Sequence, residues 1–319
     1  MRKIHFCMVL VLCMVGCATT KVNMIVRRPA EVSMKHHKKI ALGDITGRVR
    51  PHAIKLQHSL RTMLVSNSYF DSIVDRDHLQ RLLKEHELTL HGIVEENAIE
   101  IGKLTGASAF VFCRIITDDV KDEIEKGKVY TDDKGKEHQK IVRNVTYSVS
   151  VSVYIIDVTT SSVLLSRILT AERSESTNAD MKEPPRVDYE VLFDNCVNDV
   201  LSQLSRIIAP YNVTIAVKLE KDALLPDVER VLAYFRMHEF DKGLTLLKTM
   251  AEAEYQKPKI KAKALYNYGM VLLYSGFYQQ AHSVLMDAFE LVPTSKKYQK
   301  AVFEVKEEQN KYLKLKEQE

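Results

Sequence analysis

The stretch that decides the fold is VTYSVSVSVYI, which covers residues 145–155. Its odd positions, from Val145 to Ile155, are apolar or aromatic, whereas every even position carries a hydroxyl group. Strict alternation with a period of two places one set of side chains on each face of a strand. We therefore expect a half-buried strand here, in a sheet with one covered face.

Strands and helices alternate on both sides of this stretch. The pattern predicts strands over 39–46, 70–74, 108–116, 163–169 and 213–219, and helices from Pro51 to Leu64, Leu79 to Leu90, Ala98 to Leu104 and about Asp188 to Ile208. Asp157 to Ser162 forms a turn, after which the chain pairs back. This order predicts an α/β (α+β) sandwich domain with a mixed sheet over residues 38–220.

The part of the chain after Pro226 has a different, purely helical pattern. Gly269, Ala281, Ala288 and Pro293 occur at the spacing typical of a tetratricopeptide repeat, with the small residues where two helices cross. A second copy lies 38 residues upstream, so that Phe240, Gly243, Leu247 and Met250 match Tyr278, Ala281, Leu285 and Ala288. Residues 225–319 are therefore predicted to be an all-α tetratricopeptide hairpin module, closed by a charged capping helix from Tyr298.

Stacked hairpins of this kind present a concave groove lined by their first helices. In the clear repeat, the groove positions are Lys263, Tyr266, Met270 and Tyr274. Aromatic rings beside a flexible methionine and a lysine suit a protein or peptide partner. The alternative is that some of these side chains only pack on the neighbouring repeat.

The N-terminus has the composition of a bacterial lipoprotein leader. Arg2 and Lys3 precede an apolar run that ends at Val15 and is too short to cross a bilayer. Gly16 and Cys17 follow, as in a lipobox, whose cysteine is diacylated and becomes the new N-terminus. We expect a signal peptide over residues 1–16, lipid attachment at Cys17, and a polar tether over residues 17–37. The alternative is an ordinary secretory signal with a chance cysteine.

Composition excludes a disordered or fibrous protein. The chain has 319 residues, 45% of them hydrophobic, which is a globular composition with room for about two domains. Loss of Arg2 and Lys3 with the leader lowers the net charge from +4 to +2, which gives no support to nucleic-acid binding. The mature chain keeps Cys113 and Cys196, either as a disulfide or as two buried small residues.

Several segments in a fixed order resemble a known family. They are FDSIVDRDHL (70–79), LLKE (82–85), Gly92, IGKLTGA (101–107), the strand 108–116, Tyr147-Ser148-Val149 and IIDVTT (155–160). Their order and spacing behind a lipobox resemble the curli production assembly/transport (CsgG) family of envelope lipoproteins, over roughly residues 38–220. The resemblance implies an α/β domain in the cell envelope.

The family resemblance implies two kinds of function. Its best-known members form a ring whose protomers insert hairpins into the outer membrane and build a secretion channel. Others keep the α/β domain and serve as accessory factors, including activators of cell-wall synthases. The hairpins would fall at residues 118–140 and 171–187, which are rich in charge or contain Pro184-Pro185. Neither segment shows the alternating apolar pattern of a lipid-facing strand, so we expect both to be soluble loops.

No catalytic pattern is present in the sequence. It has no GxSxG, HExxH, GxxxxGK[ST] or GxGxxG, and Asp75 and Asp77 are accounted for as helix caps. We expect no enzyme, cofactor or metal, but a lipid-anchored scaffolding, assembly or export-support factor that binds proteins, with a homo-oligomer as one option. Ala18 after the cysteine favours the periplasmic face of the outer membrane. The alternatives are a secretion-channel subunit, a regulator of a cell-wall synthase, and a hydrolase with an unrecognised site.

Overall fold

The computed structural model describes residues 19–74, 102 and 104–319, which fall into two compact units. One, here called the sheet unit, comprises residues 29–211 and the last two residues of the chain. The other, called the helical unit, comprises residues 19–28 and 212–317. The signal peptide, Cys17 and the predicted helix from Leu79 to Leu90 lie outside the described residues.

The sheet unit is built on a five-stranded mixed sheet with the order β3-β2-β4-β5-β6. Strand β2 (Lys39–Thr46) runs parallel to β3 (Ser72–Val74) and β4 (Ala109–Thr131). Strands β4, β5 (Glu137–Asp157) and β6 (Val163–Asp180) are antiparallel neighbours. The predicted mixed α/β class is therefore confirmed, and the turn after Asp157 lies where the sequence places it.

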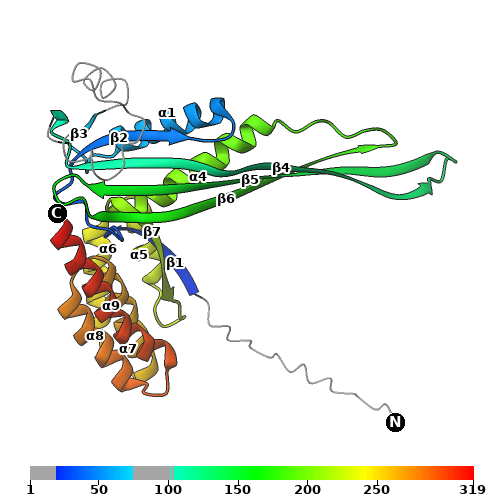
Figure 1. Ribbon diagram of the computed structural model, residues 1–319. Helices are drawn as coiled ribbons and strands as arrows, with labels where there is room; N and C mark the ends of the chain where they lie inside the picture. The colour runs from blue at the N-terminus through cyan, green and yellow to red at the C-terminus, as the bar shows by residue number, and fades with distance from the viewer. Residues whose placement is uncertain (1–18, 75–101, 103) are drawn as a thin grey trace, which may run out of the picture. The chain divides into compact units, whose positions relative to one another are not determined.

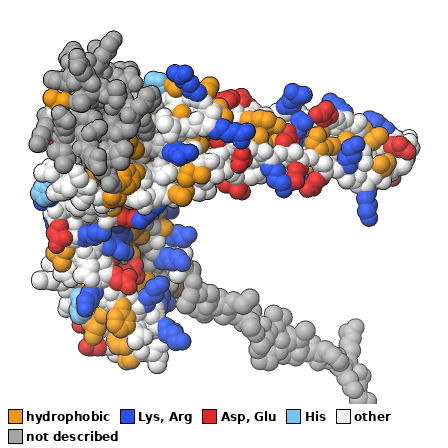
Figure 2. Space-filling model, in the orientation of Figure 1, with side chains coloured by type: hydrophobic (Ala, Val, Ile, Leu, Met, Phe, Trp, Pro, Cys, Tyr) orange, Lys and Arg blue, Asp and Glu red, His pale blue; other side chains and the backbone are white. Residues whose placement is uncertain are grey.

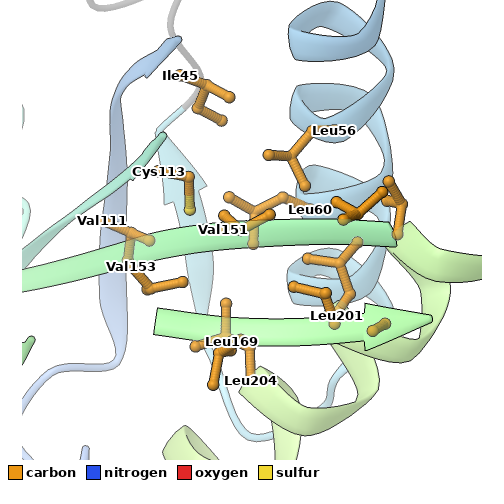
Figure 3. Close-up of a cluster of buried hydrophobic side chains, with 14 of the residues drawn as sticks. Ile45, Leu56, Leu60, Val111, Cys113, Val151, Val153, Leu169, Leu201 and Leu204 are labelled. Carbon is orange, nitrogen blue, oxygen red and sulfur yellow. The ribbon is translucent and has the colours of Figure 1, made fainter. Parts of the chain in front are cut away.

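Helices α1 (Arg50–Ser66) and α4 (Tyr189–Ile208) cover one face of this sheet (Figure 1). The odd positions of β5 face the helices, as the alternation predicts, and all of them from Val145 to Ile155 are buried. Figure 3 shows Val151 and Val153 meeting Leu60, Leu201 and Leu204 in this core. Cys113 and Cys196 are free thiols buried in the same core.

Three strands continue as a long arm, residues 117–150 and 170–180. Its inner part is still covered by α1 and α4, and its outer part extends beyond both helices (Figure 1). The prediction of soluble loops over 118–140 and 171–187 is therefore wrong, because strands occupy most of both segments. The central strand β5 supplies the reason. Its valines, isoleucines and tyrosines favour extended backbone, and its backbone gives each neighbouring strand a partner. Charged residues on β4 and β6 are accommodated because they are exposed there.

Strand β1 (Thr19–Arg28) corrects the predicted tether. It pairs with β7 (Tyr211–Glu220), and its side chains Val22 and Met24 are buried in the helical core. The alternation of Lys21, Val22, Asn23 and Met24 is the strand signal that a tether over residues 17–37 overlooks. Ala18 is therefore the single residue between Cys17 and strand β1.

Five helices make up the rest of the helical unit. They are α5 (Val228–Arg236), α6 (Phe240–Glu252), α7 (Pro258–Tyr274), α8 (Tyr278–Leu291) and α9 (Lys296–Gln318). Gly269 of α7 lies where the sequence predicts a close crossing, since a Cβ atom there would be 2.6 Å from Cγ of Leu285 in α8. Among the described residues, no helix is both long and apolar enough to cross a membrane.

Candidate functional site

The four predicted groove residues lie on one face of α7, but three of them are interior. Tyr266 and Met270 are 5% and 7% exposed, and Lys263 pairs with Asp222 at 2.7 Å. Tyr274 is partly buried. The open groove expected along this face is therefore not what the structure has.

Helix α9 accounts for this burial. The ring of Tyr298 lies 5.2 Å from that of Tyr266, and the hydroxyl of Tyr274 donates a hydrogen bond to Glu304. Burial raises the pKa of Tyr266 to about 12, and burial with Glu304 raises that of Tyr274. Both phenols therefore stay protonated at neutral pH; Tyr266 packs against Tyr298, and Tyr274 donates to Glu304. The predicted capping helix covers the surface that was expected to bind a partner.

The helical unit instead has a cavity of about 790 Å³ beside the C-terminal end of α7. It is lined by strand β1 (Lys21 to Ile25), the end of α5, the start of α6 and the α7–α8 turn, with Leu232, Phe235, Phe240, Leu244, Val271 and Phe277 among its apolar residues. Tyr274 is the one predicted groove residue that lines it. The cavity has the volume of an ordinary ligand pocket and a largely apolar wall.

A second polar cluster lies in the sheet unit where the arm begins. The imidazole Nδ1 of His52 is 2.6 Å from a carboxylate oxygen of Asp118, whose other oxygen accepts a hydrogen bond from Tyr147 at 2.7 Å. The ring of His52 stacks on Phe193 at 3.9 Å, and its Nε2 lies 3.3 Å from Glu190. These contacts join α1, β4, β5 and α4 at one point.

The electrostatics of this cluster favour a structural role. Lys55 and then His52 lower the pKa of Glu190, and Glu190 in turn raises the pKa of Lys55. Burial, helped by Asp118, raises the pKa of Tyr147, so its phenol remains a donor. The cluster therefore acts as a polar clamp that holds α1, β4, β5 and α4 together.

The arm presents mixed chemistry to solvent (Figure 2). On one face, hydroxyl groups of β5 and β6 pair across the strands, Ser150 with Thr170 at 3.1 Å and Thr146 with Ser174 at 2.9 Å. On β4, four apolar side chains are more than two-fifths exposed among charged ones: Val120, Ile124, Val129 and Tyr130. These four side chains leave apolar surface open to solvent along an ordered, projecting element.

The described residues contain no group of three or more His, Cys, Asp or Glu side chains placed to hold a metal ion. The two features that sequence reasoning missed are the cavity and the His52 cluster. His52 had no visible signal, because its partner Asp118 lies 66 residues away. Only one wall of the cavity, strand β1, could have been predicted from the sequence, because its polar and apolar residues alternate.

A comparison with known protein families finds one match, which lies in the sheet unit. Residues 51–181 match the family model described as "Curli production assembly/transport component CsgG". That match starts in α1 and ends with the arm, and it confirms the resemblance seen in the sequence. No curated protein sequence is similar enough to this chain to count as a relative.

Several solved structures are similar to the chain. Lipoprotein GNA1162 from Neisseria meningitidis is 12% identical, with 52% of this chain and 97% of that one covered and a TM-score of 0.31. The LpoB C-terminal domain from Escherichia coli is 13% identical, with 42% and 82% covered and a TM-score of 0.27. The PelC dodecamer from Paraburkholderia phytofirmans is 13% identical, with 57% and 96% covered and a TM-score of 0.25. At these TM-scores the similarities carry no argument about this chain.

Proposed function

Because residues 51–181 form a CsgG-like domain, we propose that this chain is a lipid-anchored bacterial envelope protein that assists assembly, scaffolding or export by binding proteins. The observation that carries the proposal is the family match over the sheet and arm. The matched family is described as a production, assembly and transport component. Its role here is non-enzymatic, and its proposed location is the periplasmic face of the outer membrane.

The anchor is the thioether-linked lipid at Cys17. The short apolar leader, the Gly16-Cys17 junction and the following Ala18 support it. Two or more acyl chains hold a protein stably on a bilayer.

The arm is the part we assign to partner binding in the sheet unit. It is ordered by pairing on both sides of β5, yet its outer strand β6 has no neighbour on its far side among the described residues. Unpaired strand edges and exposed apolar side chains are surfaces that another polypeptide can complete. The partner is either a different envelope protein or a second copy of this chain.

The experiment is capture from solubilised envelopes with the mature chain made without its anchor. Wild-type protein is compared with an arm variant, Ile124→Ser with Tyr130→Ser, and with a matched variant, Phe303→Ser, on α9. All three side chains are exposed, at 43%, 61% and 67%, so each variant should fold. We expect one defined set of proteins to be lost with the arm variant alone. Capture that is equal in all three would contradict a binding role for the arm.

A non-enzymatic role is supported by the way the titratable clusters are used. Asp118 is hydrogen-bonded to both His52 and Tyr147, and Lys263 is paired with Asp222 inside the helical unit. These bonds join α1, β4 and β5 in one unit and α7 to the segment before α5 in the other, so the fold itself uses these groups.

A further inference from the structure

The distance between Cys17 and the first strand is very short. Ala18 alone separates Cys17 from Thr19, where β1 begins. Two peptide units extend at most about 7 Å. The polar layer on each side of a bilayer is itself about 5–8 Å thick. If Cys17 carries the lipid, the start of β1 is held at the headgroups and cannot stand off from them.

Strand β1 carries this constraint into the helical unit. Its residues from Lys21 to Ile25 form one wall of the cavity. Lys21 lies four residues after Cys17, which is at most about 14 Å of extended chain. The mouth of the cavity is therefore within reach of the membrane surface.

The mouth is rich in exposed apolar side chains. Ile25 is 75% exposed, Phe277 48% and Phe240 44%, and all three line the cavity. Met237, between two lining residues, is 61% exposed. Single exposed apolar residues are common on protein surfaces, but four from three separate segments around one opening call for a covering surface.

The charges around the mouth fit an anionic surface. Lys21 and Arg236 line it as cations, and Asp241 is the single acidic residue among the lining residues. Basic residues beside apolar side chains are the combination that binds the interface of anionic membranes.

We propose that the helical unit docks on the lipid surface that holds Cys17, with Ile25, Met237, Phe240 and Phe277 at the headgroup level. The inference rests on the proposed function, since it takes acylation of Cys17 as its premise. Its occupant is the bilayer itself, because Cys17 precedes β1 by only two positions and because Lys21 and Arg236 stand beside the exposed apolar side chains. A peptide in the cavity is the competing outcome.

The test uses the full acylated chain in vesicles of phosphatidylethanolamine and phosphatidylglycerol that contain spin-labelled lipid. Phe277→Cys carries an environment-sensitive fluorophore, and Phe303→Cys on α9 carries the same label as the control. Labelling is selective, because the native thiols Cys113 and Cys196 are buried. We expect the Phe277 probe to be quenched several-fold more than the Phe303 probe. Adding Ile25→Asp and Met237→Asp should abolish the difference while the protein still floats with vesicles.

The outcomes separate the two proposals. Flotation with equal quenching of both probes would overturn docking and leave the Cys17 anchor intact, with the cavity open to a peptide. Quenching that survives Ile25→Asp with Met237→Asp would also overturn it, because contact would then not depend on this rim. Failure to float would overturn the anchor, and the docking inference with it.

Discussion

The contact between Gly269 and Leu285 predicts that Gly269→Ala destabilises the helical unit when residue 285 is leucine and stabilises it when residue 285 is alanine. In Gly269→Ala, the new Cβ would lie 2.6 Å from Cγ and 2.7 Å from Cδ2 of Leu285. Carbon atoms in good contact are about 3.5–4.0 Å apart, so the side chains must separate by about 1 Å. Overpacking of this kind costs about 1–3 kcal/mol, against about 1 kcal/mol gained from replacing glycine inside a helix. We expect a net loss of about 0–2 kcal/mol.

The second background is Leu285→Ala, which removes the two clashing carbons. Leu285 is fully buried, so that change alone costs about 2–5 kcal/mol. Adding Gly269→Ala should now stabilise the helical unit by about 1 kcal/mol, because the helix gain remains and the clash does not. The interaction between the two changes is thus favourable, as expected for residues in contact.

The assay is hydrogen exchange followed by mass spectrometry on peptides from α7 and α8, which reports local opening free energies in a protein with two units. All four proteins of the cycle are compared under the same conditions. A stabilising effect of Gly269→Ala in both backgrounds would refute the close crossing of α7 and α8.

Three further predictions follow from buried groups. His52→Leu should destabilise the sheet unit by about 2–4 kcal/mol in urea unfolding, because Asp118 is left buried with Tyr147 as its remaining partner in the cluster; a loss below about 0.5 kcal/mol would contradict the clamp. Lys263 lowers the pKa of Asp222, so the pair stabilises the helical unit above the ordinary pKa of 3.8 and less as pH falls through the lower folded value. The melting difference between wild type and Asp222→Asn should therefore shrink below pH 3.8, and a difference independent of pH would contradict it. Burial raises the pKa of Cys113 to about 12, so maleimide should modify it only after unfolding, and labelling of the native protein would show that the core is open.

The sheet could be predicted because its signal is local. The alternation from Val145 to Ile155 defines both faces of β5 without reference to any other part of the chain. Helix α4 could equally be predicted from its local sequence. Its predicted start, Asp188, is the N-cap, and the carboxylate of Asp188 accepts hydrogen bonds from two backbone amides. Local pattern and burial agree in both elements.

The arm and the site depended on contacts between distant residues. Strand β4 has no alternation beyond Ile116, and it remains extended because β5 pairs with it. On α1 the apolar residue Ile54 is 46% exposed, whereas the polar residue His52 is 8% exposed and hydrogen-bonded. A polar residue becomes a core residue only when its partners are known.

The groove on α7 could not be predicted correctly for a related reason. Helix α9 reads as a charged helix, yet Tyr298, Ala301 and Val305 form a narrow apolar stripe that is buried in the helical core. That stripe covers the face of α7 on which partner binding was expected. Few apolar residues are enough when the surface they meet is already formed by other helices.

The central claim, that this protein binds another polypeptide through its arm, is tested most directly by photo-crosslinking in living cells. A photoreactive phenylalanine is placed at Ile124 or Tyr130 on β4, and at Phe303 on α9 as the control. We predict that both arm positions give a crosslinked protein of one defined mass, identified by mass spectrometry as an envelope protein or a second copy of this chain. Folded, membrane-anchored protein that gives no crosslink from either arm position would contradict the account.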